Sequence, residues 1–141
     1  PGIASGSNGI TKAALNIALT YARGRRTFDK KLISYQGVSF KLAEIVTKLD
    51  AARYMTYLAA DMFDEKKDNA RQAAQAKWYA AEVAMSATVE CCQILGGYGY
   101  TNEMPAEKLM RDAKIYQIYE GASEIQKMII VGKLMRTREV H

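Results

Sequence analysis

Proline and glycine, the residues that interrupt helices, are confined to a few places in this chain. Only two prolines occur, Pro1 and Pro105, and most glycines lie in residues 2–9, at Gly24 or in residues 96–99. The long stretches between them are rich in Ala, Leu, Met, Lys, Glu and Gln, which are strong helix formers. No alternating strand pattern and no Asn-Gly hairpin is found. The sequence therefore predicts an all-α fold.

Apolar residues recur at helical spacing along most of the chain, which predicts the individual helices. Three long helices and one shorter terminal helix, joined by short loops, imply an up-and-down four-helix bundle. An extra short helix is expected to begin at Pro105, since proline suits a first helical turn. The segments 24–34 and 96–104 are expected to be loops. The bundle helices are expected at about Gly9–Arg23, Tyr35–Asp64, Asn69–Leu95 and Ser123–Arg136.

Two of these helix starts carry candidate capping residues. Ser7 or Asn8 is expected to cap the first helix through its side-chain oxygen. Asn69, with Gln72 three residues further on, resembles a capping box at the start of the third helix.

The size and composition of the chain predict one compact domain over residues 1–141. Hydrophobic residues make up 49% of the sequence, enough for a core and too many for disorder. Because the chain begins with Pro1 rather than Met, we expect it to be part of a longer polypeptide. No apolar run is long enough to span a membrane. Cys91 and Cys92 are adjacent in a helical pattern and point about 100° apart, so we interpret them as small core residues of a reducing compartment.

Positive charge is in excess, with a formal net charge of +5. These residues are interpreted as solvated helix ends or as contacts to an anionic cofactor or partner. Nucleic acid is the least favoured partner, since no aromatic residues alternate with the basic ones and no recognition motif is present. The two basic groups are Arg23, Arg25, Arg26, Lys30 and Lys31, and Lys127, Lys133, Arg136 and Arg138.

The only histidine of the chain is its last residue, His141. No Ser-His-Asp triad, Cys-His pair or histidine metal site can therefore be built from this sequence, and we expect no metal. Any chemistry must rest on carboxylates, backbone amides or a bound cofactor.

Glu120 is the first candidate for such chemistry, because it precedes Gly121 at the start of a predicted helix. Burial among its apolar neighbours would turn this carboxylate into a general base. The alternative is a helix cap, or a salt bridge to Arg111 or Lys114. The expected neighbours are Tyr116, Ile118 and Tyr119.

Two further segments suggest ligand contacts. Arg25, Thr27 and Phe28 offer a guanidinium, a hydroxyl and a ring, which suit the pyrophosphate and heterocycle of a nucleotide, although chemistry alone favours a solvated basic loop. The segment QILGGYGY, residues 93–100, has paired glycines that allow close approach of a ligand to the backbone. It lacks the preceding strand that a Rossmann or P-loop motif requires, so by itself it is a helix end and a turn.

Three motifs occur in one order: RRTFDKKLISYQ, then QILGGYGY, then MRDAKIYQIYEGASEIQ. Together they closely resemble the C-terminal helical domain of the flavin-dependent acyl-CoA dehydrogenases, over essentially the whole chain. The resemblance implies an N-terminal helical domain and a middle β domain that this chain lacks. It further implies a homodimer or homotetramer with FAD lying across a subunit interface. An acyl-CoA substrate, an electron-transfer flavoprotein as acceptor, and fatty acid β-oxidation in a bacterial cytoplasm or a mitochondrial matrix also follow from it.

The resemblance also implies roles for individual residues. Glu120 matches the base of the short- and medium-chain branch, which removes the α-proton while the β-hydrogen leaves as hydride to flavin N5, giving a trans-2-enoyl-CoA. Its amide N–H would stabilise the thioester oxygen, and Gly121 would leave room for the thioester. The positions that match FAD contacts are Arg25, Thr27, Phe28, Gln36, Gln93, Gly96, Gly97, Ala122 and Glu124.

Two residues depart from the family pattern. Asp29 replaces a usual glycine, which adds negative charge and could change the turn, and Ala122 replaces a usual threonine, which removes one hydroxyl contact to flavin. The alternatives are an oxidase or an enoyl-CoA reductase of the same superfamily, and a non-enzymatic helical scaffold. Acyl chain length and electron acceptor are left open by these residues. The 141 residues alone are expected to be inactive, because much of the cofactor pocket is missing.

Overall fold

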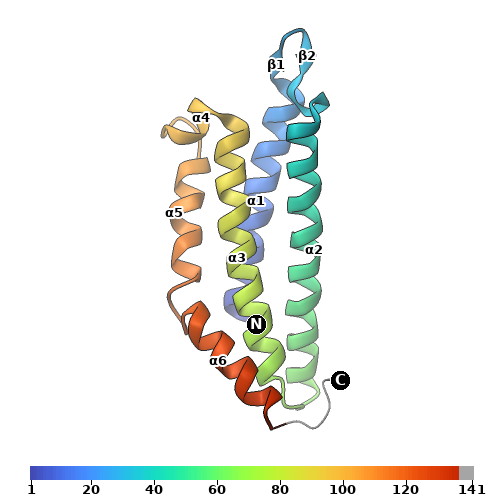
Figure 1. The fold of residues 1–141 in the computed structure, drawn as a ribbon, viewed down its shortest axis with the longest axis vertical. Helices are drawn as coiled ribbons and strands as arrows, with labels where there is room; N and C mark the ends of the chain where they lie inside the picture. The colour runs from blue at the N-terminus through green and yellow to red at the C-terminus, as the bar shows by residue number, and fades with distance from the viewer. Residues whose placement is uncertain (137–141) are drawn as a thin grey trace.

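Three long helices free of internal proline form the body of the protein. The computed structural model describes residues 1–136, and in it α1 (Gly2–Gly24), α2 (Gln36–Asp64) and α3 (Ala70–Leu95) run alternately up and down (Figure 1). The chain then turns back through α4 (Gly97–Tyr100), α5 (Ala106–Tyr116) and α6 (Ser123–Leu134), which descend along one side of α3 (Figure 1). The all-α prediction is confirmed, with α5 and α6 together forming the fourth arm.

Helix α3 lies at the centre of the bundle and packs against α1, α2, α5 and α6. Its inward face is built almost entirely of small residues, as its sequence predicted. Small side chains let neighbouring helix axes approach closely and interdigitate at the density of a protein interior. The alanines of α3 that are at most 3% exposed are Ala74, Ala76, Ala80, Ala81, Ala84 and Ala87.

The predicted start of the first helix was wrong, because α1 begins at Gly2 rather than Gly9. Ser7 and Asn8 are not caps but buried residues within the helix. The Ser7 hydroxyl donates to the Ile3 carbonyl at 3.1 Å, and the Asn8 amide donates to the Thr56 hydroxyl of α2 at 3.0 Å. A short polar side chain at an interhelical contact therefore looked like a cap in the sequence.

The predicted capping box of α3 was also wrong. Asn69 is the N-cap residue by position, but its side chain makes no capping hydrogen bond. Its amide instead donates to the carbonyl of Ala59 at 2.7 Å, which ties the end of α2 to the start of α3. The helix boundaries at Asp64 and Leu95, in contrast, agree with the prediction.

The connector after α1 is more ordered than the sequence suggested. It forms a small antiparallel hairpin, β1 (Arg26–Thr27) and β2 (Lys30–Lys31), which projects beyond the bundle (Figure 1) and leads into a 3₁₀ turn, η1 (Leu32–Ser34). The turn residues Phe28 and Asp29 have φ of 47° and 61°, the left-handed pair that a two-residue hairpin turn requires. The expectation of no strand failed here because Phe-Asp, rather than Asn-Gly, occupies this turn.

The segment 96–104 contains a short helix, α4, where only a loop was expected. Gly96 ends α3 with φ 62°, and Gly99 is buried against the last turn of α3.

Cys91 is buried and Cys92 half-buried, and both are free thiols. Burial raises the pKa of the Cys91 thiol to about 12.

None of the helices in residues 1–136 has the length and hydropathy needed to cross a membrane. Arg138 and His141 lie outside the described residues.

Replacing Gly99 by alanine should destabilise the fold, because a Cβ atom there would lie 2.5 Å from the Cys92 carbonyl oxygen. The obstructing atom belongs to the backbone of α3, so α4 would have to move away, lowering the free energy of unfolding by roughly 1–3 kcal/mol. Urea unfolding followed by circular dichroism measures this difference. The matched control is Gly97→Ala, since a Cβ atom at Gly97 meets nothing within 4 Å. Equal stability of the two variants would contradict this account of α4.

Candidate active site

The loop between α5 and α6, residues 117–122, carries the first catalytic candidate. Glu120 and Gly121 have φ of 53° and 90°, two successive residues in the left-handed region. Glycine adopts this conformation readily, whereas a glutamate does so at a cost of about 1 kcal/mol or more. Strained residues of this kind are concentrated at functional sites, so the backbone itself marks this loop.

The expected burial of Glu120 was wrong, since its side chain is exposed in this chain. Tyr116 and Tyr119 are half-buried and pack edge to face, with ring centroids 5.3 Å apart, while Ile118 is exposed. The loop lies at the margin of the bundle, and Glu120 borders an open cavity of about 400 Å³ beside Pro1, Lys77 and Gln126. A ligand or another protein domain can therefore reach the carboxylate.

Neither structural alternative for Glu120 is found. The N-cap of α6 is Ala122, and it makes no side-chain capping bond. The Arg111 guanidinium binds Glu107 at 2.8 Å, and the Lys114 ammonium donates to the Gln117 side chain at 2.8 Å. Among residues 1–136, no ion pair involves the Glu120 carboxylate.

Two side chains hold the carbonyl groups of this loop. The buried Lys77 ammonium of α3 donates to the Gly121 carbonyl at 2.7 Å. The buried Gln126 amide of α6 donates to the same carbonyl at 3.0 Å and reaches the Glu120 carbonyl at 3.4 Å. The carbonyl side of the strained turn is therefore anchored from two helices.

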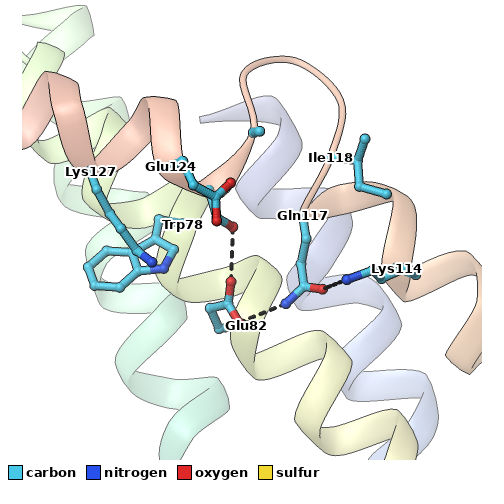
Figure 2. A pocket seen from close by; sticks show the side chains of 9 residues that line it. Trp78, Glu82, Lys114, Gln117, Ile118, Glu124 and Lys127 are labelled. Atoms are coloured by element: carbon cyan, nitrogen blue, oxygen red, sulfur yellow. Dashed lines mark hydrogen bonds between the residues drawn. The ribbon is translucent and has the colours of Figure 1, made fainter.

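Glu82 of α3 holds the two ends of the loop together (Figure 2). Its carboxylate accepts hydrogen bonds from the Gln117 amide at 2.7 Å and the Ser123 hydroxyl at 2.9 Å. The Ser123 amide N–H also donates to the Gln117 carbonyl at 3.0 Å. The first residue of the loop, Gln117, and the first residue after it, Ser123, are thus both fixed to α3.

Lys77 is a charged residue that is buried beside this loop, with only 6% of its surface exposed. Burial lowers the pKa of the Lys77 ammonium below 10.5, the usual value for lysine, since the charged form loses its hydration. The carboxylates of Glu82, Glu120 and Glu124 act in the opposite direction and favour the charged form. Lys77 and Glu82 were not among the sequence candidates. In the sequence, each was marked only by being a charged residue next to the alanine positions of α3.

The other two candidates near the base, Ala122 and Glu124, line a second cavity, of about 460 Å³. Ala122 and Glu124 line it together with Trp78, Ile118 and Lys127, and Figure 2 shows Trp78 and Lys127 beside each other. The Lys127 ammonium lies 5.1 Å from the centre of the Trp78 ring, a cation–π contact. Glu120 and the pair Ala122 and Glu124 therefore line different cavities.

The remaining candidates gather at the far end of the bundle (Figure 1). Arg25, Gly96 and Gly97 line one cavity, and Gln93, Gly96 and Gly97 line a neighbouring one. Thr27 and Phe28 belong to the hairpin, and Gln36 is the exposed first residue of α2. The Phe28 ring is 93% exposed at the turn. The structure brings Arg25 close to Gly96 and Gly97, but it does not bring this set close to Glu120.

Known proteins resemble this chain over almost its whole length. The family model described as "Acyl-CoA dehydrogenase, C-terminal domain" matches residues 1–135. The chain belongs to the acyl-CoA dehydrogenase family. The resemblance seen in the three sequence motifs is thereby confirmed.

Individual members of this family agree over almost the whole chain. The mitochondrial short-chain specific acyl-CoA dehydrogenase of Bos taurus is 47% identical, with 96% of this chain and 33% of that protein covered. The CarC subunit of the caffeyl-CoA reductase-Etf complex of Acetobacterium woodii is 40% identical, covering 96% and 36%. The structure of butyryl-CoA dehydrogenase from Megasphaera elsdenii superimposes with a TM-score of 0.94 at 47% identity, covering 96% and 35%. The chain spans about a third of the length of these acyl-CoA dehydrogenase relatives.

One departure from the acyl-CoA dehydrogenase pattern is explained by the backbone. Asp29 takes a φ of 61°, the conformation that the usual glycine would adopt without strain. Aspartate is one of the residues that tolerate this region, and the Arg26 guanidinium donates to the Asp29 carbonyl at 2.6 Å. The substitution therefore leaves the hairpin turn intact.

The stability of the fold should depend on Lys77 at alkaline pH. Because the pKa of Lys77 is lowered in the folded chain, the unfolded chain binds more protons at this group between that lowered value and 10.5. The contribution of Lys77 to the free energy of unfolding therefore rises with pH across this window. Urea unfolding of wild type and Lys77→Met, from about pH 8 to about pH 10.5, should show wild type gaining stability relative to the variant. A difference that stays constant or shrinks would be the contrary result.

Proposed function

We propose that this chain is the C-terminal domain of an FAD-dependent acyl-CoA dehydrogenase in which Glu120 removes the α-proton of an acyl-CoA thioester. The observation that carries this proposal is the Glu120 carboxylate itself, exposed beside a cavity on a turn fixed by four side-chain hydrogen bonds. It forms no ion pair within residues 1–136. The names of the short-chain and butyryl-CoA dehydrogenases support the assignment.

The backbone at Glu120 supplies the second requirement of this chemistry. The α-hydrogen of a thioester is only weakly acidic, so negative charge that develops on the thioester oxygen must meet a fixed donor. Within the described residues the amide N–H of Glu120 donates no hydrogen bond, so it is available to this oxygen. Gly121 has no side chain at the same turn, and a Cβ atom there would lie 2.4 Å from Gln126 Nε2, so the glycine makes room for the amide that fixes the turn. One residue thereby offers both the base and the oxyanion donor.

The residues at the two ends of the bundle fit FAD in different ways. FAD, when bound, accepts the β-hydrogen of the substrate as hydride. The Arg25 guanidinium, the Thr27 hydroxyl and the exposed Phe28 ring suit its pyrophosphate and adenine, and Gln36 lies at the foot of the same hairpin. Ala122 and Glu124 would approach the flavin next to the base, on the cavity that also carries Trp78.

The separation of these two sets supports an oligomer. Lys77 and Gly96 are 19 residues apart along α3, or about 28 Å at 1.5 Å per residue. We propose that the hairpin with Arg25, and the segment with Gln93, Gly96 and Gly97, contribute to the FAD of a neighbouring subunit. A homodimer or homotetramer then completes each site. The exposed apolar residues of α2, among them Phe40, Tyr54 and Leu58, are consistent with such contacts.

An electron-transfer flavoprotein is the proposed electron acceptor, supported by the name of the CarC relative. The same relative favours a second candidate function, because its name describes a reductase. An enoyl-CoA reductase would run the same chemistry in reverse, with Glu120 returning the α-proton. Anaerobic assays with an acyl-CoA and with the matching enoyl-CoA separate the two directions, and oxygen consumption without an acceptor protein would identify an oxidase.

Replacing Glu120 by glutamine should abolish turnover, since glutamine fills the same space but cannot accept the α-proton. In the polypeptide that carries this chain, anaerobic butyryl-CoA should bleach the flavin absorbance of wild type. In Glu120→Gln we expect bleaching at least 100-fold slower, the usual minimum for a lost general base, with unchanged flavin content.

The control variant is Glu65→Gln, an exposed glutamate at the α2–α3 turn, which should behave as wild type. Full activity of Glu120→Gln would exclude its role as base. A wild-type protein without flavin would instead favour a non-enzymatic scaffold.

A further inference from the structure

We propose that Lys77 and Glu82 of α3 are positioning residues that hold the Glu120 carboxylate in its reactive place by fixing the backbone of loop 117–122. This inference rests on the proposed function of Glu120. It adds two residues whose hydrogen bonds go to the loop and to Ser123 directly after it, not to the Glu120 carboxylate.

The burial of Lys77 is the first reason for this assignment. A lysine is almost never fully buried without a partner, because its ammonium loses hydration. Here the Lys77 ammonium donates to the main-chain carbonyl of Gly121, the residue directly after the base. None of the ion pairs in residues 1–136 involves Lys77. The direct contact of this ammonium is therefore the backbone of the turn, while the carboxylates of Glu82, Glu120 and Glu124 favour its charged form.

Glu82 supplies the complementary half of the support. It lies five residues after Lys77 on α3 and accepts hydrogen bonds from both ends of the loop, Gln117 and Ser123 (Figure 2). Lys77 thus binds the middle of the turn, while Glu82 holds the two ends of the loop together. The loop is attached to α3 at three points spread over its whole length.

The strain of the turn makes this support necessary. A glutamate with φ of 53° persists only where the surrounding structure over-determines its conformation. Without Lys77 or Glu82, the Glu120 backbone could relax to negative φ and carry the carboxylate away. Displacement of a reacting group by about 1 Å can lower a rate by two orders of magnitude. The predicted defect is therefore one of proton removal rather than of substrate binding.

Two variants of other residues provide matched controls. Lys41 of α2 and Glu90 of α3 form an ion pair at 2.5 Å, partly exposed and away from the loop. Lys41→Met and Glu90→Gln repeat the chemical changes of Lys77→Met and Glu82→Gln, and Glu90 lies on the same helix as Glu82. They should match wild type in every kinetic measurement described below.

The first test is kinetic and uses the flavin-loaded polypeptide that carries this chain. With butyryl-CoA, Lys77→Met and Glu82→Gln should lower kcat at least about tenfold while KM changes less than about twofold. The isotope effect with α-deuterated butyryl-CoA should increase, because proton removal becomes slower relative to other steps. A merely stabilising role would reduce the amount of folded enzyme and leave the isotope effect unchanged, which would overturn the proposal. If Lys77→Met does not fold by circular dichroism, Glu82→Gln alone decides.

The second test does not depend on activity. Amide hydrogen exchange of Ser123, whose N–H binds the Gln117 carbonyl, should be at least about tenfold faster in Glu82→Gln than in Glu90→Gln. Unchanged exchange would overturn the loop-fixing role even in an active enzyme. A wild-type protein without acyl-CoA activity, combined with faster exchange in Glu82→Gln, would reject the proposed function and retain the anchoring of the loop.

Discussion

Close helix approach through alanine is the constraint on which the rest of the structure depends. Fully buried alanines of all three long helices pack in one cluster, so these helices lie near enough for short polar side chains to reach across; the cluster consists of Ala4, Ala52, Ala59, Ala76 and Ala80. The bond from Asn8 to Thr56 and the bond from Asn69 to Ala59 both use this short distance. The same closeness brings the backbone of loop 117–122 within reach of α3. Larger residues on α3 would separate Lys77 and Glu82 from the groups they hold. The fully buried alanines of α1 and α2 are Ala4, Ala14, Ala18 and Ala22, and Ala52 and Ala59.

The sequence was most informative where one local rule decided the structure. Helical periodicity placed the ends of α2 and α3, and proline placed the start of α5. It was misleading where a polar residue had two possible uses: Ser7, Asn8 and Asn69 all looked like caps and all bind within or between helices instead. Helix propensity is a local property, whereas the partner of a buried amide is set by packing between distant segments, which one sequence does not reveal.

The candidate site was predictable to a similar degree. Glu120 was identified because its motif is specific. Its exposure was not predicted, since burial depends on which domains surround the loop. Lys77 and Glu82 were missed because a charged residue in an alanine-rich helix is normally interpreted as part of the solvent-exposed face of that helix. Only the fold shows that both bind a turn that lies 35 or more residues later in the sequence. Positioning residues are in general hard to find this way, because their spacing to the base has no fixed pattern.

The left-handed backbone at Glu120 also bears on how this protein can be engineered. Glycine would relieve the strain at φ 53°, so stability and catalysis favour different residues at this one position. A directed-evolution campaign that selects only for thermostability would therefore be drawn toward Glu120→Gly and would discard the proposed base. A screen for improved variants of this domain must include a functional readout from its first round.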